Sequence, residues 1–208
     1  MNFIEECWEQ REEIIYKFLF NGLGEGIYPI NSEVFQNQFQ REEIDPMWLH
    51  YGVFKCPPSQ SHSSWVYVTS GMSNPWETDV KKEYSGIGEE FILETNQDST
   101  WPILVLHSLM AFNILLSIGH YGDKPILDYG DRMALSIEPN LTNVMAVEPK
   151  DFPVSFELKS GKVDFLQIVG ITDTELQFAK GNSSAALSEL IYEKFGTLSI
   201  IPNRDSTI

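Results

Sequence analysis

The fold is decided by the stretch FLQIVGITDTEL, which runs from Phe165 to Leu176. Residues 165–171 are mostly apolar, too few for a typical helix and rich in β-branched side chains, so they predict a buried strand. Thr172 and Glu175 have the Thr-x-x-Glu spacing of a capping box, in which each side chain accepts a hydrogen bond from the other residue's backbone N–H. The stretch therefore predicts a strand that passes directly into a helix.

The flanking sequence predicts the other elements in an order that argues against a doubly wound parallel sheet. A long apolar segment, capped by Ser99 or Thr100, predicts a buried helix to about Gly119. Strands are expected at 48–54, 65–69, 91–95, 132–137, 144–147 and 154–158, and helices at 173–180 and 183–195. Residues 71–78 are expected to form an exposed loop. This order predicts an α+β fold, with residues 1–208 forming a single domain whose mixed, largely antiparallel sheet is flanked by helices.

The N-terminal segment predicts an amphipathic helix over about residues 3–21, which ends near Gly22 and Gly24. A period of 3.6 residues places the following side chains toward the core: Phe3, Ile4, Cys7, Trp8, Ile14, Ile15, Phe18 and Leu19. Cys7 is expected to be a small buried side chain, and a disulfide with Cys56 is the less favoured alternative.

The charge balance is strongly acidic, with 30 Asp and Glu against 14 Lys and Arg and a net charge of -16. Such a surface repels phosphate groups and argues against direct binding of DNA or RNA. Residues 83–148 hold ten acidic and two basic residues, so half of the excess lies in this part of the chain. Two interpretations remain open: a surface that keeps the protein soluble, or a face that attracts a basic partner.

The sequence offers little support for a metal site, a cofactor or catalysis. Its four histidines form no i, i+4 pair or zinc-ligand cluster, and His107 is expected to be a hydrogen-bonded core residue. Residues 85–88, Ser-Gly-Ile-Gly, predict a turn or bulge instead of a phosphate-binding loop, because a strand follows them. The carboxylate pairs Glu89–Glu90 and Asp128–Asp131 would suit acid–base chemistry only if one cleft held them. We expect no enzyme activity.

The N-terminus lacks the basic and apolar regions of a secretory signal, which predicts a cytoplasmic protein. The apolar segment at 103–118 contains polar residues and falls short of the roughly 20 residues needed to span a bilayer. We therefore expect no membrane association.

Four segments, taken together and in order, resemble the Suppressor of fused domain family. They are Ser64–Asn74 (SWVYVTSGMSN), Ser85–Thr95 (SGIGEEFILET), Thr100–Pro102 (TWP) and Phe165–Leu176. The resemblance covers roughly residues 45–195 and concerns the N-terminal domain of the animal proteins, which also carry a second domain. It implies a protein-binding module. The animal members hold a zinc-finger transcription factor inactive, and short bacterial members resemble immunity proteins that neutralise toxins of polymorphic secretion systems.

The resemblance also implies a docking region. In the animal family a partner peptide binds as an added strand, with contributions from the helix after Thr-Trp-Pro and from the loop that follows it. The helix tyrosine of that family corresponds to Phe112, which lacks the hydroxyl donor, whereas Gly122-Asp123 keeps the Gly-Asp pair of the loop. The missing hydroxyl argues against the same peptide partner.

A basic toxin, for example a nuclease that binds phosphate groups, would suit the acidic surface. The candidate charge contacts are Asp123, Asp128 and Asp131, and the candidate aromatic anchors are Trp76, Tyr121 and Tyr129. The alternative for each aromatic residue is that it packs against the core, as we expect for Trp65 and Trp101. Three functions remain, in order of preference: an immunity protein that binds a basic toxin domain, a regulatory adaptor that binds an extended peptide, and a hydrolytic enzyme.

Overall fold

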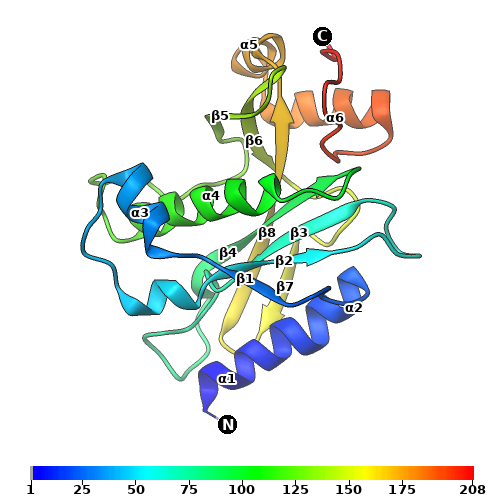
Figure 1. Cartoon of the computed structure of the whole chain (residues 1–208). Coiled ribbons are helices and arrows are strands. Elements are labelled where there is room, and N and C mark those ends of the chain that lie inside the picture. The colour runs from blue at the N-terminus through cyan, green and yellow to red at the C-terminus, as the bar shows by residue number, and fades with distance from the viewer. Residues whose placement is uncertain (1) are drawn as a thin grey trace.

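The computed structural model describes residues 2–208, which form an open eight-stranded sheet with helices on both faces (Figure 1). The helices are α1 (Phe3–Trp8), η1 (Glu9–Tyr16), α2 (Lys17–Phe20), α3 (Ser32–Phe39), η2 (Pro46–His50), α4 (Trp101–Ser117), α5 (Asp173–Gly181) and α6 (Ser184–Phe195). The strands are β1 (Ile27–Pro29), β2 (Gly52–Cys56), β3 (Trp65–Ser70), β4 (Tyr84–Thr95), β5 (Arg132–Glu138), β6 (Leu141–Val147), β7 (Ser155–Leu158) and β8 (Gly161–Ile171). The predicted α+β class and single domain are confirmed.

The sheet has the strand order β1-β2-β3-β4-β8-β6-β5, and β7 pairs with the first half of β8. The central strands β4 and β8 run parallel, with Phe91 opposite Leu166, and the other strand pairs among residues 2–208 are antiparallel. The sheet is therefore mixed and largely antiparallel, as predicted. Strand β5 pairs only with β6 and forms one edge of the sheet.

Alternating side chains divide the core between the two faces of the sheet. Tyr67 of β3 and Leu166 of β8 contribute to the cluster that packs under α4, whereas Val66, Val68 and Phe165 contribute to the cluster beneath the N-terminal helix. Helices α5 and α6 pack at the far end of the sheet, over the C-terminal half of β8 and over β6 (Figure 1). Both faces of the central strands are thus buried.

The joint between β8 and α5 has the predicted capping box. Thr172 Oγ1 accepts a hydrogen bond from Glu175 N at 3.2 Å, and Glu175 Oε2 accepts one from Thr172 N at 2.9 Å. The sequence did not reveal that Glu175 is fully buried and pairs with Arg204, whose Nη1 and Nη2 lie 2.6 and 2.8 Å from its carboxylate oxygens. Arg204 Nη2 also donates to Gly170 O at 2.9 Å. This contact anchors the C-terminal segment beneath the start of α5.

The predicted N-terminal helix is present at residues 3–20, but the predicted buried face is wrong in part. Phe18 and Ile14 are 83% and 62% exposed, whereas Arg11, Tyr16 and Phe20 are buried. The central segment η1 is a π-helix, whose wider turn adds one residue to the period. Buried positions therefore recur after five residues between Arg11 and Tyr16, which a constant 3.6-residue period does not predict.

One loop prediction and one strand prediction need correction. Residues 71–75 are buried instead of exposed, and the strand expected at 48–54 is the 3-10 helix η2 followed by β2. Proline at the start of η2 and the cap formed by Asp45, whose Oδ1 accepts from Met47 N at 2.9 Å, favour the helical turn. Thr100 occupies the N-cap of α4, but its side chain makes no capping hydrogen bond.

Other local predictions are confirmed. Gly86 and Gly88 have positive φ angles of 59° and 94° at a register shift of β4, so the Ser-Gly-Ile-Gly segment forms a bulge. His107 Nε2 lies 3.0 Å from Tyr28 O, and Cys7 and Cys56 are buried free thiols.

Within residues 2–208, no helix combines the length and apolar character needed to cross a bilayer.

Candidate functional site

The three predicted acidic contacts lie exposed on the loop between α4 and β5. Asp128 and Asp131 form a turn in which Asp131 Oδ2 accepts from Asp128 N at 2.9 Å and Asp128 Oδ1 accepts from Tyr129 N at 2.6 Å. Asp123 makes no hydrogen bond or ion pair with any of residues 2–208. Asp131 directly precedes Arg132, the first residue of β5, so this acidic turn lies at the start of the sheet's edge strand.

The three predicted aromatic anchors are half-buried, and each packs against other residues of the chain. Tyr129 Oη donates to Phe165 O at 3.0 Å, and burial raises the pKa of this phenol far above its ordinary range. Tyr121 packs against Phe112 with ring centroids 5.5 Å apart. Trp76 lies elsewhere, against Trp8 and η2, so the structure does not unite it with the two tyrosines. These contacts support the alternative in which the aromatic residues pack against the core.

An apolar groove of about 320 Å³ lies beside the edge strand. Helix α3 contributes Phe39, α4 contributes Leu109 and Phe112, and β5 contributes Met133 and Leu135. Phe112 stacks on Phe39 with their rings at 20° and their centroids 6.2 Å apart. Phe112, the residue to which the family resemblance pointed, therefore lines a groove next to an edge strand. Such a strand has unpaired backbone groups, and a peptide can add to it as a further strand.

The neighbouring carboxylates Glu89 and Glu90 point to opposite faces of β4, so they form no acid–base pair in one cleft. Asn113 Nδ2 donates to Glu89 Oε2 at 3.0 Å, and Asn113 Oδ1 accepts from Leu127 N at 2.8 Å. Burial, reinforced by Asp128, Asp164 and Asp131, raises the pKa of Glu89 to about 8. Glu89 therefore helps to position the loop that carries the acidic turn.

Glu90 is the centre of a buried polar network on the other face of β4. Its carboxylate accepts hydrogen bonds from Thr69 Oγ1 at 2.6 Å, Gly71 N at 2.9 Å, and Ser73 N and Oγ at 3.0 and 2.6 Å. The network fixes the first residues of the loop at 71–78. Because backbone N–H groups and hydroxyls surround the carboxylate, it is satisfied although it is fully buried.

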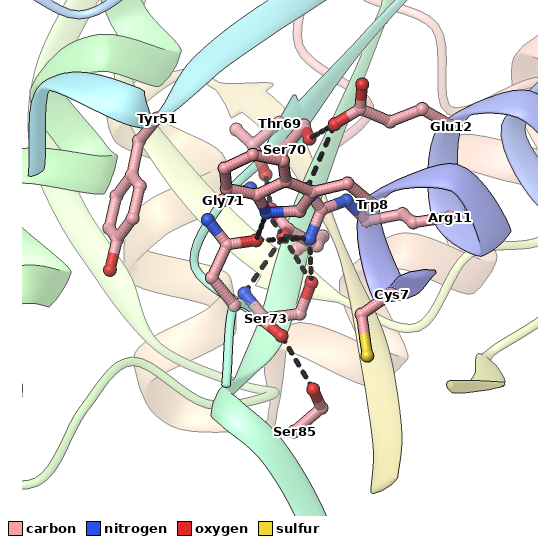
Figure 2. Close-up of polar contacts among 12 residues, drawn as sticks. Cys7, Trp8, Arg11, Glu12, Tyr51, Thr69, Ser70, Gly71, Ser73 and Ser85 are labelled. Carbon is pink, nitrogen blue, oxygen red and sulfur yellow. Dashed lines mark hydrogen bonds and ion pairs between the residues drawn. The ribbon is translucent and has the colours of Figure 1, made fainter. Parts of the chain in front are cut away.

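Arg11 joins this network from the N-terminal helix. Figure 2 shows its guanidinium reaching Ser73, with Glu12 and Ser70 beside it. Its Nη1 lies 3.0 Å from Ser73 Oγ, 2.8 Å from Asn74 Oδ1 and 3.9 Å from a Glu90 oxygen. Trp8 Nε1 donates to the same Asn74 oxygen at 2.8 Å. The N-terminal helix thus holds the loop at 71–78 through buried polar contacts.

The same loop forms one wall of a second cleft, of about 350 Å³. The cleft lies between η2, the loop at 71–78, the start of β4 and the end of α4. Its lining includes four aromatic side chains, three charged side chains and several apolar ones: Trp48, Tyr51, Trp76, Tyr84, Asp45, Glu77, Lys82, Met47, Ile87, Ile114 and Ile118. Trp76 Nε1 donates to Tyr51 Oη at 3.0 Å, which fixes two of the aromatic rings. We call this the aromatic cleft.

The described part of the chain contains no cluster of potential metal ligands. No group of three or more His, Cys, Asp or Glu side chains within residues 2–208 is arranged to hold a metal ion. The features suited to function are thus a groove beside an edge strand, an acidic turn and the aromatic cleft.

Sequence reasoning missed Arg11, Asn74 and the roles of Glu89, Glu90 and Asn113. Two signals were available, because Glu89-Glu90 precede an apolar strand segment and Asn113 interrupts an apolar helix. A polar side chain in such a place is either buried with partners or directed at solvent. The pairing of Arg11 with Ser73 and Asn74 joins residues more than 60 positions apart and has no local signal.

Comparison with known proteins agrees with this architecture. The sequence model described as Suppressor of fused protein matches residues 47–205. No curated protein matches the chain in sequence. Among solved structures, the chain is similar to the one described as the Sufu-Fu complex, at 18% identity and a TM-score of 0.59, over 85% of this chain and 88% of that one.

Two further solved structures are similar. Drosophila Suppressor of Fused matches at 18% identity and a TM-score of 0.57, over 76% of this chain and 42% of its own length. A Suppressor of fused homologue from Neisseria gonorrhoeae matches at 19% identity and a TM-score of 0.56, over 85% and 93% of the two chains. At these identities the structures show a shared fold, and the sequence match over most of the chain shows the family. The chain therefore belongs to the Suppressor of fused family.

Proposed function

We propose that this chain is a non-enzymatic protein-binding module that acts in the cytoplasm as an immunity protein, binding and neutralising a basic toxin domain. The observation that carries the proposal is the apolar groove beside the free edge of β5, with the exposed Asp128 and Asp131 at the start of that strand. An extended partner segment would add to the edge through its backbone and place apolar side chains in the groove.

Charge supports a basic partner. The net charge of -16 attracts cationic surfaces at long range, and Asp123, Asp128 and Asp131 are exposed where they can meet such a surface. Attraction of this kind speeds association and weakens as salt screens it. Nuclease toxins that bind phosphate carry cationic surfaces of the required kind.

The test is affinity capture from the native cell with the tagged protein, at low salt, followed by elution at high salt and identification of the eluted chain. We expect a toxin domain whose activity the purified protein inhibits. The variant Asp128→Asn/Asp131→Asn keeps the turn's hydrogen-bond acceptors and should lower the association rate about tenfold or more. Leu135→Lys should weaken binding through the groove, whereas Ile14→Lys, exposed on the opposite face, is the matched control. Absence of inhibition by the wild-type protein would overturn the proposal.

The second candidate is a regulatory adaptor that binds an extended peptide of a transcription factor or another regulator. The groove beside β5 suits an adaptor as well as an immunity protein. Strand addition requires only an extended segment of the partner, whatever the rest of that protein is. Capture of such a regulator, with binding lost in Leu135→Lys and little affected by salt, would favour the adaptor over the immunity protein.

A further inference from the structure

We propose that the aromatic cleft binds the guanidinium group of an arginine side chain carried by a basic protein segment. The inference deepens the proposed function, because it rests on a basic partner, but it concerns a site away from the β5 groove. The two sites share no lining residue.

The lining has the chemistry that recognises arginine. Trp48, Tyr51, Trp76 and Tyr84 bring aromatic rings to one cleft, and Asp45 and Glu77 bring carboxylates. A cation is attracted to the face of an aromatic ring, and tryptophan is the most effective partner. The planar, weakly hydrated guanidinium stacks on such rings and pairs with carboxylates more readily than the compact ammonium of lysine.

Both carboxylates remain available for a ligand. Neither Asp45 nor Glu77 forms an ion pair among residues 2–208. Asp45 uses one oxygen to cap η2 and keeps the other. Lys82 is the one cation among the lining residues and is exposed, so the lining carboxylates outnumber the lining cations by one. Lys162 Nζ lies 5.5 Å from the centroid of the Tyr84 ring, but its charge is paired with Asp164 at 2.7 Å. A ligand cation would complete the charge balance of the cleft.

The size and rim of the cleft suit one side chain of a protein segment. Its volume of about 350 Å³ is near the lower end of the range of roughly 300–1,000 Å³ for ligand pockets. Met47, Tyr84 and Ile118 on the lining are 42%, 42% and 49% exposed. These apolar surfaces can cover the aliphatic stem of an arginine while its charged end meets the exposed carboxylates of Asp45 and Glu77.

The cleft is also organised before any ligand binds. The hydrogen bond between Trp76 and Tyr51 fixes two rings, and the buried network around Glu90 fixes the loop that carries Trp76. Side chains that are already ordered lose little entropy on binding. Even a short peptide should therefore bind detectably.

The experiment titrates the full-length protein with the blocked peptides acetyl-Gly-Arg-Gly-amide, its lysine analogue and its citrulline analogue, which is uncharged and close in shape to arginine. Indole N–H signals in ¹⁵N NMR spectra report binding, and Trp76→Phe and Trp48→Phe assign them. We expect saturable shifts of the Trp48 and Trp76 signals, with the arginine peptide binding at least about fivefold more tightly than citrulline and more tightly than lysine.

Three variants separate a charge effect from a general loss of structure. Asp45→Asn/Glu77→Gln should weaken arginine binding at least about fivefold while the Asn keeps the cap of η2, and Lys82→Ala should strengthen it. Glu193→Gln, an exposed carboxylate on α6, is the matched control and should change nothing. Equal binding of citrulline and arginine, or unchanged binding in the double variant, would overturn the inference. Because no toxin is used, this result and the capture experiment can fail independently.

Discussion

Asn113 Nδ2 lies 3.0 Å from Glu89 Oε2, and this one hydrogen bond couples helix α4 to strand β4 beneath the acidic turn. Asn113 Oδ1 accepts a hydrogen bond from Leu127 N, so the Asn113 side chain connects α4 to β4 and to the loop that follows α4. Both side chains are buried, and the carboxyl group of Glu89 faces a region where Asp128, Asp131 and Asp164 add negative charge. Ionisation of Glu89 in this place is costly.

Glu89→Gln should therefore make stability less dependent on pH. The pKa of Glu89 is raised from an ordinary value of 4.5 to about 8 in the folded protein, so the folded state binds a proton that the unfolded state has released. The stabilisation from this group is full below about pH 4.5 and is lost as pH rises to about 8. The free energy of unfolding of Glu89→Gln, relative to wild type, should rise by about 2–4 kcal/mol between pH 5 and 8.5.

Urea denaturation of both proteins at several pH values measures this difference. Histidines and other groups that titrate in the same range are present in both proteins and cancel in the comparison. Parallel pH profiles of the two proteins would contradict the raised pKa of Glu89.

Arg11→Met should strongly destabilise the protein although it lies on a surface helix. The substitution removes the cation that faces Glu90, leaves Ser73 Oγ without its donor in a buried site, and leaves Asn74 Oδ1 with the donor Trp8 Nε1 alone. Breaking a buried ion pair in this way costs about 3–5 kcal/mol. Phe18→Ser on the same helix is the control and should cost less than about 1 kcal/mol, because Phe18 is exposed. Chemical denaturation that finds Phe18→Ser the more damaging change would refute the π-helical register.

Arg204→Met should destabilise the fold, and the loss of stability should depend on pH. Burial acts to raise the pKa of Glu175, but the hydrogen bonds and charge of Arg204 outweigh it and the pKa is lowered. The substitution leaves that carboxylate without its cation, at a cost of about 3–5 kcal/mol at neutral pH. A lowered pKa contributes stability above the unfolded pKa, and this contribution is lost as pH falls through the folded pKa. The difference between the two proteins should therefore shrink toward pH 3 in thermal or urea unfolding. A difference that stays constant with pH would show that Arg204 acts through packing alone.

The sequence predicted those parts of the fold in which short-range pattern determines structure. The β8–α5 joint was readable because the β-branched run and the Thr172–Glu175 spacing are both local. The buried face of the N-terminal helix was not, because η1 changes the helical period and because Arg11 is buried by partners on a distant loop. Among the candidate site residues, the exposure of Asp128 and Asp131 could be predicted, because charged side chains are seldom buried. The contacts of Trp76 with Trp8 and Tyr51 depend on the tertiary fold and could not be inferred from nearby sequence.

Gly86→Ala should disturb the aromatic cleft as well as stability. Gly86 has a φ angle of 59°, and a Cβ atom there would lie 2.5 Å from Met72 O and 2.7 Å from Asn74 O. Because both atoms belong to the backbone of the loop that carries Trp76, the loop must shift to make room. We expect a loss of about 1–3 kcal/mol and a changed Trp76 indole signal in NMR spectra. Gly181→Ala, at the end of α5 with open space around its Cβ position, should be neutral or slightly stabilising. An unchanged Trp76 signal in Gly86→Ala would show that the loop's position does not depend on the bulge of β4.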